Sequence, residues 1–316
     1  MPRGHHTQSV KGALAALVLA ALAGCETAVV ATAPIAPRPV ARTVAPQPPS
    51  AASETTRVYF ATVQADLLSQ GLLRTDGGGR DTPYTDRMLA DNFIRVALFD
   101  EYQRGANGFA QRETESRLRR WQAPVRVGLN FGASVPPDRQ ATDRARIASY
   151  LARLSQITGH PIGLSDSAPN FFLHIVNEDE RRALGPVISA ALRGLSPSEV
   201  AGITGMPRST YCLVYAVSDS SSSYTRAFAV IRSEHPDLLR LSCLHEELAQ
   251  GLGLANDSPR ARPSIFNDDE EFALLTTQDE LMLRMLYNPA LRPGMSLDEA
   301  RPIVQKLAYD LLGGES

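Results

Sequence analysis

The sequence has almost no excess of charge of either sign. Its 32 basic and 34 acidic residues leave a formal net charge of -2 at pH 7. A chain with so little net charge creates no long-range field that would draw nucleic acid or an anionic lipid surface. We therefore expect no nucleic-acid partner, and any attachment to a membrane must come from another feature.

The first part of the chain lacks a hydrophobic run long enough to cross a bilayer. The apolar residues 12–22 follow Arg3 and Lys11 and form about a dozen positions, which suits a secretory signal peptide. The run ends in LAGC, which resembles the bacterial lipobox. We expect residues 1–24 to be a lipoprotein signal peptide and Cys25 to be acylated; an ordinary signal peptide with an incidental cysteine is the alternative. Glu26, in place of aspartate, favours the outer membrane over the inner one.

Cysteine is scarce, and the chain has no GxSxG serine motif. With Cys25 assigned to lipid, Cys212 and Cys243 remain as an even pair in an oxidising compartment, and we expect them to form a disulfide. Two buried free thiols are the alternative. No cysteine or serine is then left in a recognisable nucleophile motif.

Composition divides the chain into five parts. Residues 25–55, the acylated cysteine and a segment rich in Ala, Thr and Pro, have almost no charge and predict an extended, disordered tether. From Thr56 the composition becomes that of a globular domain. We expect an N-terminal helical part over 56–120, a main domain over 121–294 and a C-terminal helical extension over 295–316, where Ser296 and Glu299 have capping-box spacing.

Hydrophobic periodicity predicts an α+β fold with a mixed sheet. Helical spacing covers residues 84–102, 138–158 and a segment from Pro236 to about 251–253. Alternating or continuous apolar runs predict strands at 124–131, 170–176, 211–217 and 224–231. The order strand, helix, strand, two strands, helix is the order in which zincins build their N-terminal subdomain, which is an analogy of fold.

The segment CLHEELAQGLGLAND, residues 243–257, carries the candidate site. In the zinc motif HExxHxxGxxH, three histidines bind the metal, the glutamate activates water and the glycine turns the chain. A reading from His245 places Ala249, which has no lone pair, at the second ligand position. A reading from Glu246 works better. It places Glu246, Gln250 and Asn256 at the ligand positions, Glu247 at the general base and Gly253 at the turn.

The residues that follow resemble the end of the matrixin-like metzincins. Ser264, Ile265 and Phe266 match a SIM-type Met-turn with Phe in place of Met. The final helix is matched by Leu275, Thr276, Asp279, Leu286 and Tyr287. The resemblance implies a zincin-like, metzincin-like domain whose zinc ligands have been replaced.

A second resemblance covers more of the chain. The EExAQxLGLxND core, the following SIFND, and the segments NFIRVALFDEY and LRRWQAPVRVGL are similar to the DUF2927 family, from about residue 86 to 291. That resemblance implies family membership and no particular activity.

The matched positions offer one carboxylate and two amides. Amides are poor zinc ligands and catalytic zinc sites nearly always include at least two histidines, so zinc catalysis is disfavoured. A hard cation, Ca²⁺ or Mg²⁺, is an alternative, with oxygen ligands from Glu246, Asn256 and Asp257 and further ones from Gln250, Asp268 and Asp269. Glu246 and Glu247 are adjacent, and a separation of about 100° around a helix disfavours a cooperative acid/base pair. His245 is interpreted as a helix histidine, since no second histidine lies at i+4.

These observations favour a protein without catalytic activity and without a cofactor, although a residual role for Glu247 stays open. We expect a lipid-anchored protein of the cell envelope that faces the periplasm and binds a peptide or another envelope protein as a pseudo-protease, by strand addition to the edge of its sheet. The alternative is a hydrolase that uses a non-zinc hard metal or a divergent metalloprotease site.

Overall fold

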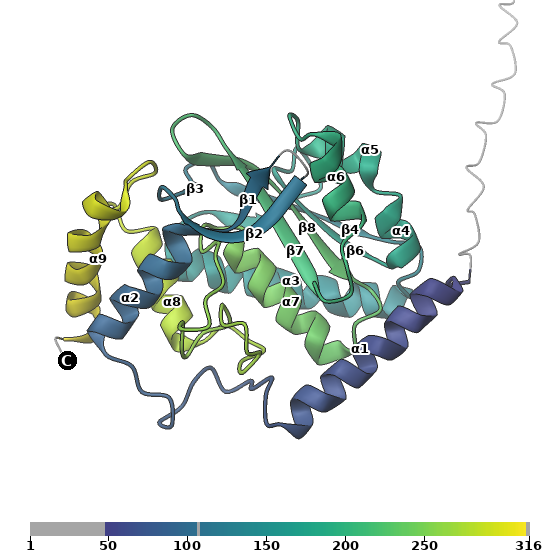
Figure 1. The fold of residues 1–316 in the computed structure, drawn as a ribbon, viewed down its shortest axis with the longest axis horizontal. Helices are drawn as coiled ribbons and strands as arrows, with labels where there is room; N and C mark the ends of the chain where they lie inside the picture. The colour runs from purple at the N-terminus through teal and green to yellow at the C-terminus, as the bar shows by residue number, and fades with distance from the viewer. Residues whose placement is uncertain (1–47, 106–107, 314–316) are drawn as a thin grey trace, which may run out of the picture. The chain divides into compact units, whose positions relative to one another are not determined.

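The computed structural model describes residues 48–105 and 108–313 (Figure 1). The expected signal peptide, the lipidation site Cys25 and residues 25–47 of the expected tether lie outside the described residues. Within the part that is described, no helix has both the length and the apolar character needed to span a bilayer.

A mixed, mainly parallel sheet forms the centre of the fold (Figure 1). The parallel strands are β3 (Arg120–Trp121), β4 (Val125–Phe131), β5 (Ile162–Leu164), β6 (Phe171–Val176) and β8 (Ser223–Arg232). Strand β7 (Cys212–Ser218) runs antiparallel to β8. Residues 227–231 of β8 pair with both β6 and β7, so β7 lies on the side of β8 away from β6. It is therefore an edge strand.

Helices cover both faces of the sheet. Alternate residues of a strand point to opposite faces: Phe171 and Ala229 belong to one hydrophobic cluster, whereas Phe228 and Val230 belong to another. The first cluster is covered by α2 (Asp86–Ala97), α3 (Pro137–Thr158), α7 (Asp237–Gln250), α8 (Thr277–Leu286) and α9 (Leu297–Leu312). On the other face lie α4 (Glu178–Arg182), α5 (Gly185–Ala191) and α6 (Pro197–Thr204). The protein is thus mixed α/β, with crossover helices, rather than the segregated arrangement that α+β denotes.

The N-terminal region differs from the expected helical part. Helix α1 (Ala51–Ser69) begins inside the segment 25–55 that was expected to be a tether. Its first turn is held by a tertiary contact, because Ser53 Oγ donates to the buried carboxylate of Glu234 at 2.7 Å. The helix expected over 84–102 ends at Ala97. A hairpin of β1 (Phe99–Gly105) and β2 (Gly108–Glu115) follows it.

The other expected elements lie close to where the periodicity placed them. The observed bounds differ from the predicted ones by at most a few residues for six elements: β4, β6, β7, β8, α3 and α7. The capping box of α9 is present, because Ser296 Oγ accepts from Glu299 N and Glu299 accepts from Ser296 N. Strand β5 and helices α4 to α6 were not anticipated; β5 has only 3 residues, too few for a periodic signal.

Candidate functional site

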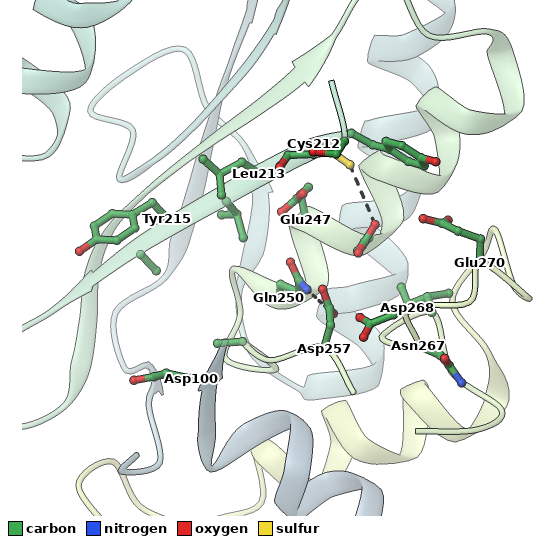
Figure 2. A pocket seen from close by; sticks show the side chains of 18 of the residues that line it. Asp100, Cys212, Leu213, Tyr215, Glu247, Gln250, Asp257, Asn267, Asp268 and Glu270 are labelled. Carbon is green, nitrogen blue, oxygen red and sulfur yellow. Dashed lines mark hydrogen bonds between the residues drawn. The ribbon is translucent and has the colours of Figure 1, made fainter. Parts of the chain in front are cut away.

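A cavity of about 680 Å³ lies between the edge strand β7 and helix α7 (Figure 2). Residues 212–216 of β7 line one wall. Helix α7 contributes Glu246, Glu247 and Gln250, and the chain after the helix contributes side chains between residues 255 and 270. The motif helix and the edge strand thus share one open site.

The charged side chains that line this cavity are acidic, with one exception. Arg119 is the one basic residue among its described lining residues, and it is ion-paired with Asp100. Because the whole chain has a net charge of only -2, negative charge is concentrated here and favours positively charged ligands. The acidic lining residues are Asp100, Glu246, Glu247, Asp257, Asp268 and Glu270.

The carboxylates of the two adjacent glutamates of α7 lie close together, although the residues are separated by about 100° around the helix. One carboxylate oxygen of Glu246, one of Glu247 and Sγ of Cys212 all lie within 4.8 Å of one another. Glu247 is 3% exposed, whereas Glu246 is half-buried at the cavity surface. Long side chains can converge even from neighbouring helix positions, so this pair can act together on one ligand.

Of the three matched ligand positions, the structure brings two to the cavity. Gln250 Nε2 donates to Asp257 Oδ1 at 2.7 Å, and both side chains line the cavity (Figure 2). Asn256 is 1% exposed and is not among the lining residues. Its Nδ2 donates to the Arg95 carbonyl oxygen at 2.9 Å. Asp257, one residue further on, lies beside Gln250 instead.

A zinc ion held in the metzincin manner does not fit these residues. Gln250 turns an amide N–H, which is a donor, toward Asp257, and Asn256 faces away toward α2. Only Glu246 remains at its matched position with a charged oxygen donor, and one carboxylate is too few for a zinc site.

Gly253, the expected turn glycine, has a backbone conformation that other residues rarely adopt. Its φ is 130°, and a Cβ atom at this position would lie 2.3 Å from the Arg119 carbonyl oxygen. Glycine is required here both for the positive φ and for the close approach of the two chain segments.

The turn at residues 264–266 packs under the site. Phe266 is fully buried, and Ile265 lines the cavity. Asp279 of α8 holds the turn, because its carboxylate accepts from Ser264 Oγ at 2.5 Å and from Ile265 N at 3.0 Å. Burial raises the pKa of Asp279 to about 6, and these hydrogen bonds act in the opposite direction.

His245 is a core residue rather than a ligand. Its ring stacks on Tyr150 with centroids 3.9 Å apart, and its Nδ1 accepts from Leu275 N at 3.2 Å. Burial, with a smaller effect of Arg153, lowers the pKa of His245 to about 3. Nδ1 can accept a hydrogen bond only when the ring is neutral, which agrees with the lowered pKa.

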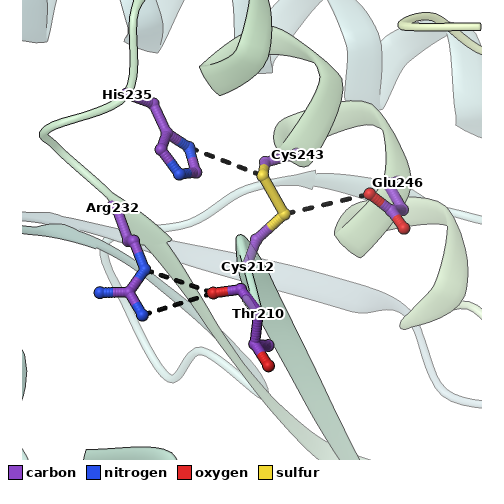
Figure 3. Close-up of a disulfide and its surroundings, with 6 residues drawn as sticks. All are labelled: Thr210, Cys212, Arg232, His235, Cys243 and Glu246. Atoms are coloured by element: carbon purple, nitrogen blue, oxygen red, sulfur yellow. Dashed lines mark hydrogen bonds between the residues drawn. A yellow bond between two sulfur atoms is a disulfide. The ribbon is translucent and has the colours of Figure 1, made fainter. Parts of the chain in front are cut away.

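The predicted disulfide between Cys212 and Cys243 is present (Figure 3). It joins β7 to α7 across 31 residues of sequence, with Cα atoms 5.8 Å apart. Cys212 lines the cavity, whereas Cys243 is buried beside His235, whose Nδ1 lies 3.7 Å from Cys243 Sγ. The bridge therefore connects the two main walls of the site.

Sequence reasoning missed Glu270 as a residue of the cavity. It belongs to the acidic run NDDEE, which gives no sign of which side chains turn inward. Glu270 has a positive φ of 57°, and its carbonyl oxygen accepts from Leu73 N at 2.9 Å. Burial, together with Asp269 and Asp268, raises the pKa of Glu270 to about 7.

Replacing Glu270 with glutamine should stabilise the protein at alkaline pH. The folded pKa lies above the ordinary value, so folding favours the protonated carboxyl; that stability is fully present below pH 4.5 and is lost as pH rises through 7. After allowance for partial solvent screening, the free energy of unfolding of Glu270→Gln should exceed that of the wild type by on the order of 2 kcal/mol at pH 8. At pH 4.5 the two free energies should be nearly equal. Urea denaturation at the two pH values measures this, and an equal effect at both would contradict it.

The fold and the site together define a mixed α/β protein with an acidic cavity beside the free edge of its sheet. The profile of the family described as "Protein of unknown function (DUF2927)" matches residues 86–306, and the chain belongs to this family. Comparison with curated proteins and with solved structures finds no significant match.

Proposed function

We propose that this chain is a lipid-anchored protein of the cell envelope whose metzincin-like domain binds an extended, basic peptide without zinc catalysis. The observation that carries the proposal is the position of β7. It pairs with β8 on one side and, among the described strands, with none on the other, and its residues 212–216 line the acidic cavity. An edge strand offers backbone donors and acceptors to a peptide, and the carboxylates opposite complement Lys and Arg side chains.

The order of elements supports the metzincin-like assignment. Strand β4, helix α3, strands β6, β7 and β8 and then α7 occur in the zincin order, with β5 between α3 and β6 and helices α4 to α6 between β6 and β7. The motif helix lies beside the edge strand. The turn at residues 264–266, held by Asp279 of α8, packs under the cavity, as a Met-turn would. The lipid anchor rests on the LAGC sequence ending at Cys25, and the outer membrane remains the proposed location.

Peptide binding can be tested on the full chain by fluorescence anisotropy with two labelled peptides of equal length, one rich in Lys and Arg and one rich in Glu. We expect binding of the basic peptide, weakened by salt, and protection of the amides of residues 211–216 from hydrogen exchange. The double variant Glu246→Gln/Asp257→Asn should weaken binding about tenfold, because two charges leave the cavity.

The matched control is Asp298→Asn/Asp310→Asn, which removes the same charge from the α9 helix. It should change the affinity by less than about twofold, since exposed distant charges are screened. Equal binding of both peptides, or an equal loss in both double variants, would show that the cavity does not select a basic peptide.

A bound Ca²⁺ or Mg²⁺, with or without hydrolase activity, is the second proposal for this site. Gln250 and the carboxylates of Glu246 and Asp257 could contribute oxygen ligands, whereas Asn256 donates its amide elsewhere. Thermal melts of the full chain should be unchanged by a chelator and by Ca²⁺ if the peptide proposal is correct. A melt lowered by chelator and restored by Ca²⁺ would favour the cation instead.

A further inference from the structure

The sulfur of Cys212 lies beside the two glutamates of the motif helix. Glu246 Oε2 is 4.0 Å from Cys212 Sγ, and an oxygen of Glu247 completes a group whose three atoms are all within 4.8 Å of one another (Figure 3 shows Cys212 and Glu246). The sulfur comes from β7 and the two oxygens from α7. The group therefore spans the two walls that the disulfide joins.

One thiolate and two carboxylates would form a suitable donor set for a borderline divalent metal such as Zn²⁺ or Co²⁺. With metal–sulfur and metal–oxygen bonds of about 2.3 and 2.1 Å, two ligands of one tetrahedral ion lie roughly 3.6 Å apart. The observed 4.0 Å between Cys212 Sγ and Glu246 Oε2 needs an adjustment of only a few tenths of an ångström. The Glu247 oxygen, which lies within 4.8 Å of both atoms, would have to move by up to about 1.4 Å, which a rotation of its side chain supplies. The cavity gives a fourth ligand access to this group.

We propose that Cys212, Glu246 and Glu247 form a transition-metal site that the disulfide keeps closed and that reduction opens. A disulfide sulfur has no thiolate charge and is a poor metal ligand. Cys212 is the half of the bridge that lines the cavity, and Cys243 is buried next to His235. The site uses a different ligand set from the zinc motif, and it does not require that a peptide bind the cleft.

The opening step is a thiol–disulfide exchange with a dithiol reductant. One reductant sulfur attacks Cys212 Sγ, the S–S bond breaks, and Cys243 leaves as a thiolate that takes up the proton released by the attacking thiol. The second reductant sulfur then displaces Cys212, and the reductant leaves as a disulfide after giving up two electrons. Cys212 loses its proton to solvent as it binds the metal.

The test uses the full chain with Cys243→Ala, which frees Cys212 without a reductant. We expect this variant to bind equimolar Co²⁺ with a thiolate-to-cobalt charge-transfer band in the near ultraviolet, and Zn²⁺ to displace it. Glu246→Gln in the same background should weaken Co²⁺ binding by about tenfold or more, because a ligand is lost. Asp268→Asn, another carboxylate of the cavity, should change it by less than about threefold.

The control Cys212→Ala/Cys243→Ala keeps Cys25 and should show no band; a band of equal strength there would overturn the proposal. So would a Cys243→Ala chain that takes up no cobalt. If loss of the bridge lowers the stability of the chain, Zn²⁺ should raise the melting temperature of Cys243→Ala and leave that of the double variant unchanged. Equal melts with and without Zn²⁺ would also overturn it. No peptide is present, so failure here leaves the peptide proposal untouched.

Discussion

Asp279→Ala should lower the free energy of unfolding by about 3 to 5 kcal/mol, because three buried donors lose their acceptor and each costs roughly 1 to 3 kcal/mol when left unsatisfied. These donors are Ser264 Oγ, Ile265 N and Thr276 N, at 2.5 to 3.0 Å from the Asp279 carboxylate. A fourth, Thr276 Oγ1 at 2.8 Å, keeps the Pro263 carbonyl oxygen as a second acceptor. Asp279 is itself fully buried. The loss should loosen both the start of α8 and the turn under the cavity.

Urea denaturation of the full chain measures this effect. Asp310→Ala is the matched control, since it removes an exposed aspartate that pairs with Lys306 on α9, and it should cost less than about 1 kcal/mol. Asp279→Asn keeps the shape and part of the acceptor capacity, so its effect should fall between the two. Equal losses in Asp279→Ala and Asp310→Ala would show that the turn does not depend on this carboxylate.

Removal of the disulfide should have the next largest effect. In the chain-entropy model, a bridge that spans 31 residues stabilises the folded state by about 3 to 4 kcal/mol, because it restricts the unfolded chain. The double variant Cys212→Ala/Cys243→Ala should lose this amount, measured by urea denaturation. Wild type treated with a phosphine reductant should lose a similar amount.

The reduced wild type also provides the control for packing, because it keeps both side chains and loses only the covalent bond. The double variant in turn should not respond to the phosphine, since it has no bridge to reduce. A wild-type chain whose stability is unchanged by complete reduction would contradict the prediction.

Several features of the site could be predicted from the sequence because they depend on neighbours along the chain. The register of the motif followed from spacing, which places Glu246 and Gln250 one helical turn apart on α7, and both line the cavity. The pairing of Cys212 with Cys243 followed from there being no other partner once Cys25 was assigned to lipid. The strand and helix boundaries of the sheet followed from the spacing of apolar residues.

Other features depended on contacts that no local pattern contains. The helix expected over 84–102 was predicted too long, because the helical spacing of apolar residues continues to Phe99. In the structure the helix ends at Ala97 and a hairpin follows it. Glu270 lines the cavity, and its carbonyl oxygen accepts from Leu73 N, a partner almost two hundred residues earlier in the chain. The convergence of Glu246 and Glu247 depended on side-chain torsions and not on helix geometry alone.

The sequence by itself determined the helix that carries the candidate site, the disulfide and the positions of four central strands along the chain, since periodicity and the small number of cysteines are properties of the chain. Only the tertiary structure decided which side chains meet. Asn256 faces the Arg95 carbonyl on α2, 161 residues away in sequence, and Asp257 faces Gln250 instead. Two neighbouring loop residues point their side chains in different directions. Which of them faces the cavity depends on the hydrogen-bond partners that the folded protein places nearby.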